Sequence, residues 1–118
     1  PVKGYREEDN VPKDSQVETY MAMKLFVNNW RWNGVPIYLR GGKRLTRRAT
    51  EIAITFKKGA NPLGAPNVLV IHIQPNEGIS LKINSKVPGL NQVVQPVKMD
   101  FRYSSYFGGS PPEAYERL

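Results

Sequence analysis

A cluster of five basic side chains surrounds a glycine pair in the segment YLRGGKRLTRR, residues 38–48. The five are Arg40, Lys43, Arg44, Arg47 and Arg48. Glycines lack Cβ atoms, so a ligand can approach the backbone next to Lys43 closely. Lysine and arginine donate charge-assisted hydrogen bonds to phosphate oxygens. We therefore expect Lys43 and Arg48 to converge on one small anion such as a phosphate monoester.

Three other interpretations of this cluster deserve comparison with its sequence. A P-loop requires a glycine five positions before the Gly-Lys pair and a Ser or Thr after it, but Ile37 and Arg44 occupy those positions. The P-loop is therefore excluded. A nucleic-acid surface is compatible with the net charge of +7, although no zinc-finger, RNP-like or GXXG motif supports it. An ordinary solvated turn is also compatible with the pattern, so these last two stay open.

Two polar residues lie near the end of the apolar segment NVLVIHIQ, residues 67–74. Gln74 ends this segment just before Pro75, where a glutamine usually bonds to backbone groups or water. His72 lies on the same face two residues earlier, and a lone histidine in an apolar strand is typical of a packed core residue. The sequence suggests no partner for it. Because the chain has one histidine and no cysteine, we expect no metal site and no disulfide.

Period-two alternation of apolar residues predicts five or six strands and no helix of ten residues. The expected strand segments are residues 16–28, 35–39, 50–58, 67–74, 78–86 and 96–104. The asparagine-rich segment 28–34 between the first two is typical of a turn. These elements predict a large antiparallel sheet whose most apolar strand, 67–74, is covered on both faces.

Length and composition limit the number of domains and the class of protein. A chain of 118 residues that is 40% hydrophobic and 23% charged is expected to fold as one domain with a core. The longest apolar run is far too short to cross a membrane. Ser110, the prolines after it and Glu113 form a helix-start pattern close to the end of the chain. We expect the chain to be a piece of a longer protein, with missing helices or a second subunit over one face.

Three long segments together resemble the C-terminal domain of the glucose-6-phosphate dehydrogenase family. They are NWRWNGVPIYLRGGKRL, VIHIQPNEGISLKINSK and PPEAYERL. The resemblance implies an α+β fold, with a large, mostly antiparallel sheet whose covering helices are largely missing here. Residues 1–118 would then be part of the substrate-binding and dimerisation domain, and the N-terminal dinucleotide-binding domain would be absent.

The resemblance also implies a function for the parent protein. The parent would oxidise glucose 6-phosphate to 6-phosphogluconolactone with NADP, in the pentose phosphate pathway of the cytoplasm. Lys43, Arg48 and Gln74 match the family's substrate contacts. The family's catalytic histidine, its aspartate partner and the NADP fingerprint would all lie upstream of Pro1. We therefore expect no catalytic residue and no bound cofactor in this chain, and no activity from it alone.

Some family members bind a second, structural NADP on this domain. Three residues match that site, namely Arg40, Lys82 and Asp100. Four other positions of the site, which hold lysine, arginine, arginine and tyrosine in those members, are here Ala49, Ala53, His72 and Ser80. We expect this site to be absent. The expected partners are glucose 6-phosphate, the N-terminal domain and a second copy bound through the sheet, with no membrane and no nucleic acid. The alternative is a basic β module that binds nucleic acid or another anion.

Overall fold

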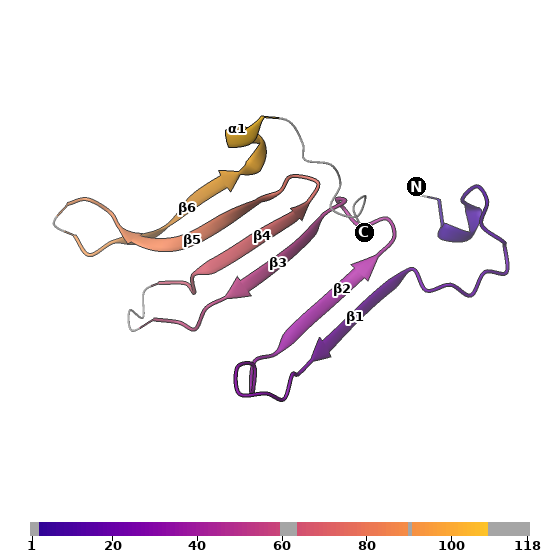
Figure 1. Ribbon diagram of the computed structural model, residues 1–118, viewed down its shortest axis with the longest axis horizontal. Helices are drawn as coiled ribbons and strands as arrows, with labels where there is room; N and C mark the ends of the chain where they lie inside the picture. Colours follow the sequence, from indigo (N-terminus) through magenta and orange to yellow (C-terminus); the bar gives the residue numbers. More distant parts are fainter. Residues whose placement is uncertain (1–2, 60–63, 90, 109–118) are drawn as a thin grey trace. The chain divides into compact units, whose positions relative to one another are not determined.

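The computed structural model describes residues 3–59, 64–89 and 91–108 (Figure 1). The elements are a 3-10 turn η1 (Tyr5–Glu7), strands β1 (Tyr20–Leu25), β2 (Ile37–Gly42), β3 (Thr50–Thr55), β4 (Val68–Gln74), β5 (Gly78–Lys86) and β6 (Val94–Arg102), and a short helix α1 (Tyr103–Phe107). They fall into two compact units, Pro1–Arg47 and Arg48–Leu118.

The first unit contains an antiparallel hairpin of β1 and β2, with Tyr20 opposite Gly42 and Leu25 opposite Ile37. The predicted turn is confirmed. Asn29 closes it, because its Oδ1 accepts hydrogen bonds from the backbone N–H groups of Arg31 at 3.1 Å and Trp32 at 2.8 Å.

Both strands of this hairpin differ from their predicted lengths. The first was expected over 16–28 but is six residues long, because its ladder with β2 begins at the Tyr20–Gly42 pair. The second was expected to end at Leu39 but continues through Arg40 to Gly42. Arg40 and both glycines are therefore part of a strand, and the loop begins at Lys43.

The second unit contains a four-stranded antiparallel sheet in the order β3–β4–β5–β6. β5 has the predicted bounds, and β4 begins one residue later than expected. The register between β3 and β4 shifts at Thr50 and Glu51, so Thr50 pairs with Gln74 and Glu51 with His72.

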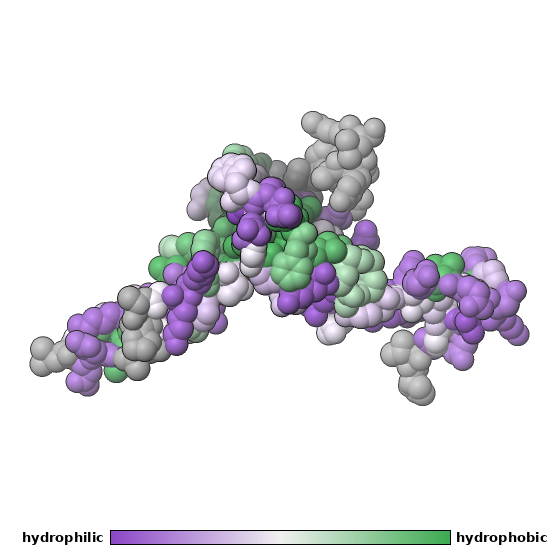
Figure 2. Space-filling view, turned by 90° about the horizontal axis from the view of Figure 1, so that it is seen from below, coloured by the Kyte–Doolittle hydropathy of each residue, from purple (hydrophilic) through white to green (hydrophobic). Residues whose placement is uncertain are grey.

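The mostly antiparallel fold class is confirmed, but the described strands form two hydrogen-bonded sheets instead of one. The prediction of a core was wrong for this part of the chain: among the described residues no hydrophobic side chain is buried. All seven β4 residues are half-buried, so the described residues alone do not cover both faces of this strand, and cover by missing helices or a second subunit stays a prediction. Figure 2 shows hydrophobic residues, in green, at the surface. The physical reason is that a β-sheet needs a second layer on a face in order to bury it.

The C-terminal part of the described chain turns from strand to helix. Tyr103 was expected to continue the last strand but starts α1, and the rings of Tyr103 and Tyr106 lie 5.1 and 4.9 Å from that of Phe101. These contacts place α1 against the end of β6. The helix predicted from Ser110 lies outside the described residues.

Candidate functional site

The glycine pair in YLRGGKRLTRR serves two purposes. A Cβ on Gly41 would meet no heavy atom within 4 Å, so the backbone there is open to a ligand. A Cβ on Gly42 would lie 2.9 Å from Cδ2 of Tyr20 and 3.1 Å from the Thr19 carbonyl oxygen. The sequence interpretation of open backbone therefore applies to Gly41, whereas Gly42 is required for packing against β1.

Lys43 is the first residue after β2, and its position is fixed through its backbone. Its N–H donates to the Thr19 carbonyl at 2.7 Å, one residue beyond the regular ladder. Its side chain is exposed, with Nζ 6.0 Å from the ring centroid of Tyr5. Within the described residues Lys43 has no carboxylate partner. A fixed backbone and an unpaired ammonium group suit an anion contact.

Arg44 is an exposed residue of the bend after β2, as the interpretation of a solvated turn expects, and it also makes an ion pair. Its Nε donates to Glu8 Oε1 at 2.8 Å, an ion pair between residues 36 positions apart. Arg44 also adopts a left-handed backbone conformation, with φ of 54°, which turns the chain sharply after Lys43. Arg44 therefore joins the N-terminal segment to the loop after β2. Arg47 is also exposed.

Arg48 and Gln74 lie at the same end of the β3–β4 pair. Gln74 is the last residue of β4 and pairs with Thr50, and Arg48 precedes Thr50 by two residues. Arg48 is exposed and Gln74 is half-buried. The ladder thus brings together two of the three predicted substrate contacts. Lys43 belongs to the first compact unit, so its convergence with Arg48 on one anion stays a prediction.

A row of polar side chains crosses the second sheet, with one residue from each strand. Glu51, His72, Ser80 and Asp100, here named the polar row, come from β3, β4, β5 and β6. His72 Nδ1 lies 3.6 Å from Glu51 Oε2, and His72 Nε2 lies 2.9 Å from Ser80 Oγ. The Ser80 hydroxyl donates a short hydrogen bond to Asp100 Oδ1. The sequence suggested no partner for His72, and the structure places Glu51 and Ser80 beside its ring nitrogens.

The hydrogen bonds of the polar row determine the role of His72. Because the Ser80 hydroxyl gives its proton to Asp100, its oxygen is left as the acceptor for His72, and Nε2 must carry a hydrogen. Ser80 is only 4% exposed. Both ring nitrogens of His72 thus face groups of the sheet itself. His72 is a structural residue and is not placed as a general base.

The Asp100 carboxylate is contacted by three donors, which are Ser80, Lys98 and Arg102. The Ser80 hydroxyl, with the hydrogen bond and charge of Lys98 and the charge of Arg102, lowers the pKa of the Asp100 carboxyl to about 2. Lys98 Nζ lies 3.3 Å from Oδ1, and Arg102 Nε lies 3.3 Å from Oδ2. Desolvation acts in the opposite direction but is outweighed. Asp100 is therefore ionised at neutral pH.

These contacts decide whether the positions compared with the structural NADP site fit that group. The Asp100 carboxylate is negative, and Lys98 and Arg102 are already engaged with it. His72 is bound to Ser80 and Glu51. Of the compared positions that lie in this sheet, His72, Ser80 and Asp100 are engaged with one another and Lys82 is the one lysine or arginine, so the absence of this cofactor site stays a prediction.

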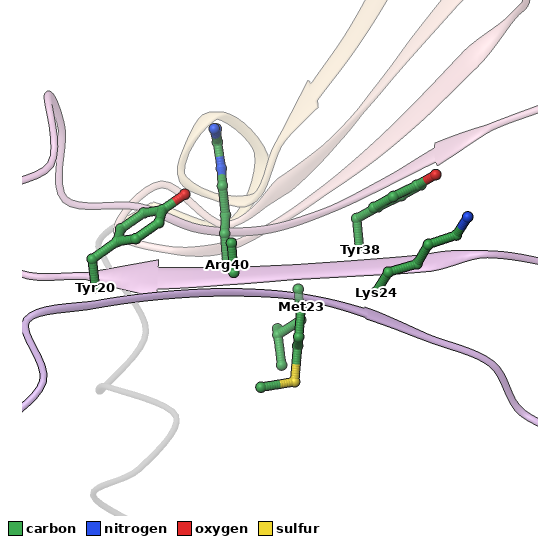
Figure 3. Close-up of a pocket in the computed structure, with 7 residues that line it drawn as sticks. Tyr20, Met23, Lys24, Tyr38 and Arg40 are labelled. Atoms are coloured by element: carbon green, nitrogen blue, oxygen red, sulfur yellow. The ribbon is translucent and has the colours of Figure 1, made fainter.

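The first hairpin has one polar, aromatic face and one apolar face. Tyr20, Lys24, Tyr38 and Arg40 project on one side, and Met23 projects on the other (Figure 3). Together with neighbouring residues they border a shallow depression of about 500 Å³. Lys24 Nζ lies 5.6 Å from the Tyr38 ring centroid. Arg40 thus projects from a strand face and does not share the loop of Lys43.

The described residues contain neither a membrane-spanning helix nor a cluster of metal ligands. None of their helices has the length and hydropathy to span a membrane. Across ranges 3–59, 64–89 and 91–108, no three histidine, cysteine or acidic residues are grouped so as to hold a metal ion.

Sequence reasoning missed the polar row, and also the hydrogen bond that Arg102 Nη1 donates to the Asn76 carbonyl oxygen at 2.9 Å. One available signal was the occurrence of polar His72, Ser80 and Asp100 in otherwise apolar or alternating strands. Their partnership depends on strand register, which sets which residues 8 and 20 positions apart become neighbours.

Comparisons with known proteins give a consistent result. The family model described as glucose-6-phosphate dehydrogenase, C-terminal domain, matches residues 1–118. A glucose-6-phosphate 1-dehydrogenase of Chlamydia pneumoniae is 58% identical, and the match covers 99% of this chain and 25% of that protein. One of Borreliella burgdorferi is 47% identical, with 98% and 26% covered. The chain spans about a quarter of the length of these curated relatives.

Solved structures agree with the sequence matches. A structure described as glucose-6-phosphate dehydrogenase in complex with its substrate glucose-6-phosphate has a TM-score of 0.79 and 42% identity, covering 95% of this chain and 24% of that one. A glucose-6-phosphate 1-dehydrogenase from Mycobacterium avium has a TM-score of 0.68 and 34% identity, covering 85% and 23%.

Proposed function

Because this chain belongs to the glucose-6-phosphate dehydrogenase family, as its C-terminal domain, we propose that it supplies sugar-phosphate contacts to a full-length dehydrogenase. The full-length enzyme oxidises glucose 6-phosphate to 6-phosphogluconolactone with NADP, in the cytoplasm. The observation that carries this proposal is a solved relative in complex with glucose 6-phosphate, which shares 42% identity over 95% of this chain.

The proposed contacts are Lys43, Arg48 and Gln74. A phosphate monoester carries up to two negative charges and accepts several charge-assisted hydrogen bonds, each worth about 1.5–3 kcal/mol. Lys43 supports this role because its ammonium group is exposed and lacks a carboxylate partner among the described residues. Arg48 and Gln74 support it through their shared end of the β3–β4 pair.

The chemistry of the reaction is proposed to belong to the N-terminal domain. NADP bound there accepts a hydride from C1 of the sugar when that domain is present. This chain's residues bind and orient the substrate, and none of them is proposed to remove a proton. His72, the only histidine, supports this division because both of its ring nitrogens face groups of its own sheet.

The exposed apolar faces support two proposed partners, the N-terminal domain and a second copy of the chain. Met21, Met23 and Leu25 on β1 are each more than 40% exposed. Several exposed apolar side chains on one face of a strand are typical of a surface that packs against another domain or subunit. We propose that the two partners together supply the layers that these sheets lack.

The test is an assay of the full-length enzyme. Purified protein is expected to reduce NADP with glucose 6-phosphate far more efficiently than with unphosphorylated glucose, because the phosphate contacts contribute binding free energy. Equal kcat/KM for the two sugars would overturn the role of Lys43 and Arg48. Loss of all sugar oxidation, together with tight and steeply salt-dependent binding of an oligonucleotide, would instead favour the polyanion-binding module.

A further inference from the structure

The segment that follows Gln74 is held by the end of β6. Arg102 Nη1 donates to the Asn76 carbonyl oxygen at 2.9 Å. The backbone N–H of Tyr103 donates to the Glu77 carbonyl oxygen at 3.1 Å. Two successive residues of the chain, Arg102 and Tyr103, therefore hold two of the three residues that connect β4 to β5. The Arg102 contact is the one made by a side chain, so it can be removed by substitution.

A glycine makes room for this contact. Gly78 begins β5, pairs with Arg102 on β6 and is buried. A Cβ at Gly78 would lie 3.1 Å from Arg102 Cδ and would collide with the Phe101 carbonyl oxygen. Because position 78 lacks a side chain, the Arg102 side chain can pass over β5 and reach the Asn76 carbonyl.

The polar row holds Arg102 in this direction. Asp100 Oδ2 accepts from Arg102 Nε at 3.3 Å, and Oδ1 lies 3.5 Å from Nη2. Asp100 is itself bound by the buried Ser80 hydroxyl. The guanidinium group thus has one edge on a fixed carboxylate and one N–H group on the turn. A planar, multiply bonded arginine is well suited to fixing a loop in one position.

We infer that Arg102 is a positioning residue, which holds the turn after β4 so that Gln74 presents its side-chain amide to the substrate. This inference rests on the proposed function, because it takes Gln74 as a substrate contact. Arg102 itself does not touch the sugar phosphate. It acts through the Asn76 carbonyl, two residues from Gln74, and its orientation derives from Asp100.

The test is a double-mutant cycle in the full-length enzyme. Arg102→Met is expected to raise KM for glucose 6-phosphate about tenfold and to change kcat by less than about threefold, because a displaced contact weakens binding. In a Gln74→Ala background the same substitution is expected to raise KM by less than about twofold, because the residue through which it acts is gone.

Lys98→Met is the matched control. It removes another cation that contacts Asp100, because Lys98 Nζ lies 3.3 Å from Asp100 Oδ1, the oxygen that also accepts from Ser80. Lys98 makes no contact with the turn. Its KM is expected to stay within about twofold of wild type. Arg102→Lys, which keeps the charge beside Asp100, is expected to recover part of the KM loss. If Arg102→Met does not fold, Arg102→Lys replaces it in the cycle with Gln74→Ala.

The outcomes separate this inference from the proposed function. An unchanged KM in Arg102→Met, equal effects of Arg102→Met and Lys98→Met, or the full KM effect in the Gln74→Ala background would each overturn the positioning role. If wild-type enzyme shows no activity with glucose 6-phosphate, the proposed function has failed and the inference fails with it. If the wild-type enzyme is active with glucose 6-phosphate and any one of the three contrary results is found, only the positioning role fails and the proposed function stands.

Discussion

Two regions of this chain concentrate charge, and they use it differently. After β2, Lys43 presents an exposed ammonium group whose contact among the described residues is the ring of Tyr5. Across the four-stranded sheet, Lys98 and Arg102 are both bound to Asp100. The comparison teaches that similar basic residues separate into ligand contacts and structural residues according to whether the fold already supplies their anion.

The largest expected effect comes from the unpaired lysine. Lys43→Ala in the full-length enzyme removes a charge that binds the sugar phosphate, and loss of such a contact in an enclosed site costs about 2–5 kcal/mol. KM for glucose 6-phosphate should therefore rise by tens to thousands of fold. Steady-state kinetics measures this, and an unchanged saturation curve would remove Lys43 from the substrate site.

The second effect concerns the glycine that precedes Lys43. Gly42→Ala places a Cβ 2.9 Å from the Tyr20 ring and 3.1 Å from the Thr19 carbonyl oxygen. We expect a loss of about 1–3 kcal/mol in the free energy of unfolding, as for other overpacked sites. Gly41→Ala is the matched control, because its Cβ meets nothing within 4 Å. Urea denaturation of both variants measures the difference, and equal midpoints would contradict the packing role of Gly42.

The third effect is a pH dependence of the free energy of unfolding, caused by Asp100 in the four-stranded sheet. The folded pKa of Asp100 is lowered to about 2, so its ionised form stabilises the fold. That contribution is complete above the ordinary aspartate pKa of about 4 and is lost as the pH falls towards 2. The stability difference between wild type and Asp100→Asn should be constant from pH 7 to pH 5 and shrink below pH 4. A difference that grows on acidification would contradict the assignment.

The smallest effect concerns the ion pair of the first unit. Glu8→Gln removes the carboxylate that accepts from Arg44, whose side chain is 57% exposed. Surface pairs of this kind contribute about 0–1 kcal/mol, so the unfolding midpoint should shift only slightly. KM should rise by less than about threefold, since Lys43 is also fixed through Thr19. A KM change as large as that of Lys43→Ala would mean that Arg44 itself binds the substrate.

Sequence reasoning predicted the local features of this fold well. Alternation from Gly78 to Lys86 defined β5, and the asparagines around Asn29 defined the hairpin turn. These signals lie within a few residues of each other along the chain. They are also why the position of Gln74 at the end of a strand could be predicted.

The features that sequence reasoning did not predict depend on distant partners. Arg44 pairs with Glu8, and Ser80 with Asp100, across 36 and 20 positions. A period-two pattern says which face a residue occupies, but not which strand lies next to it. The same limit explains why the two sheets were predicted as one, and why the sequence suggested no partner for His72.

The most direct test of the comparison is equilibrium binding of glucose 6-phosphate to the full-length enzyme without coenzyme, measured by calorimetry. The pair Lys43→Ala and Lys98→Ala removes one exposed lysine from each region. We expect Kd to rise at least about 30-fold for Lys43→Ala and less than about twofold for Lys98→Ala, because of these two lysines only Lys43 lacks an anionic partner among the described residues. Equal changes in Kd for the two variants would contradict this account.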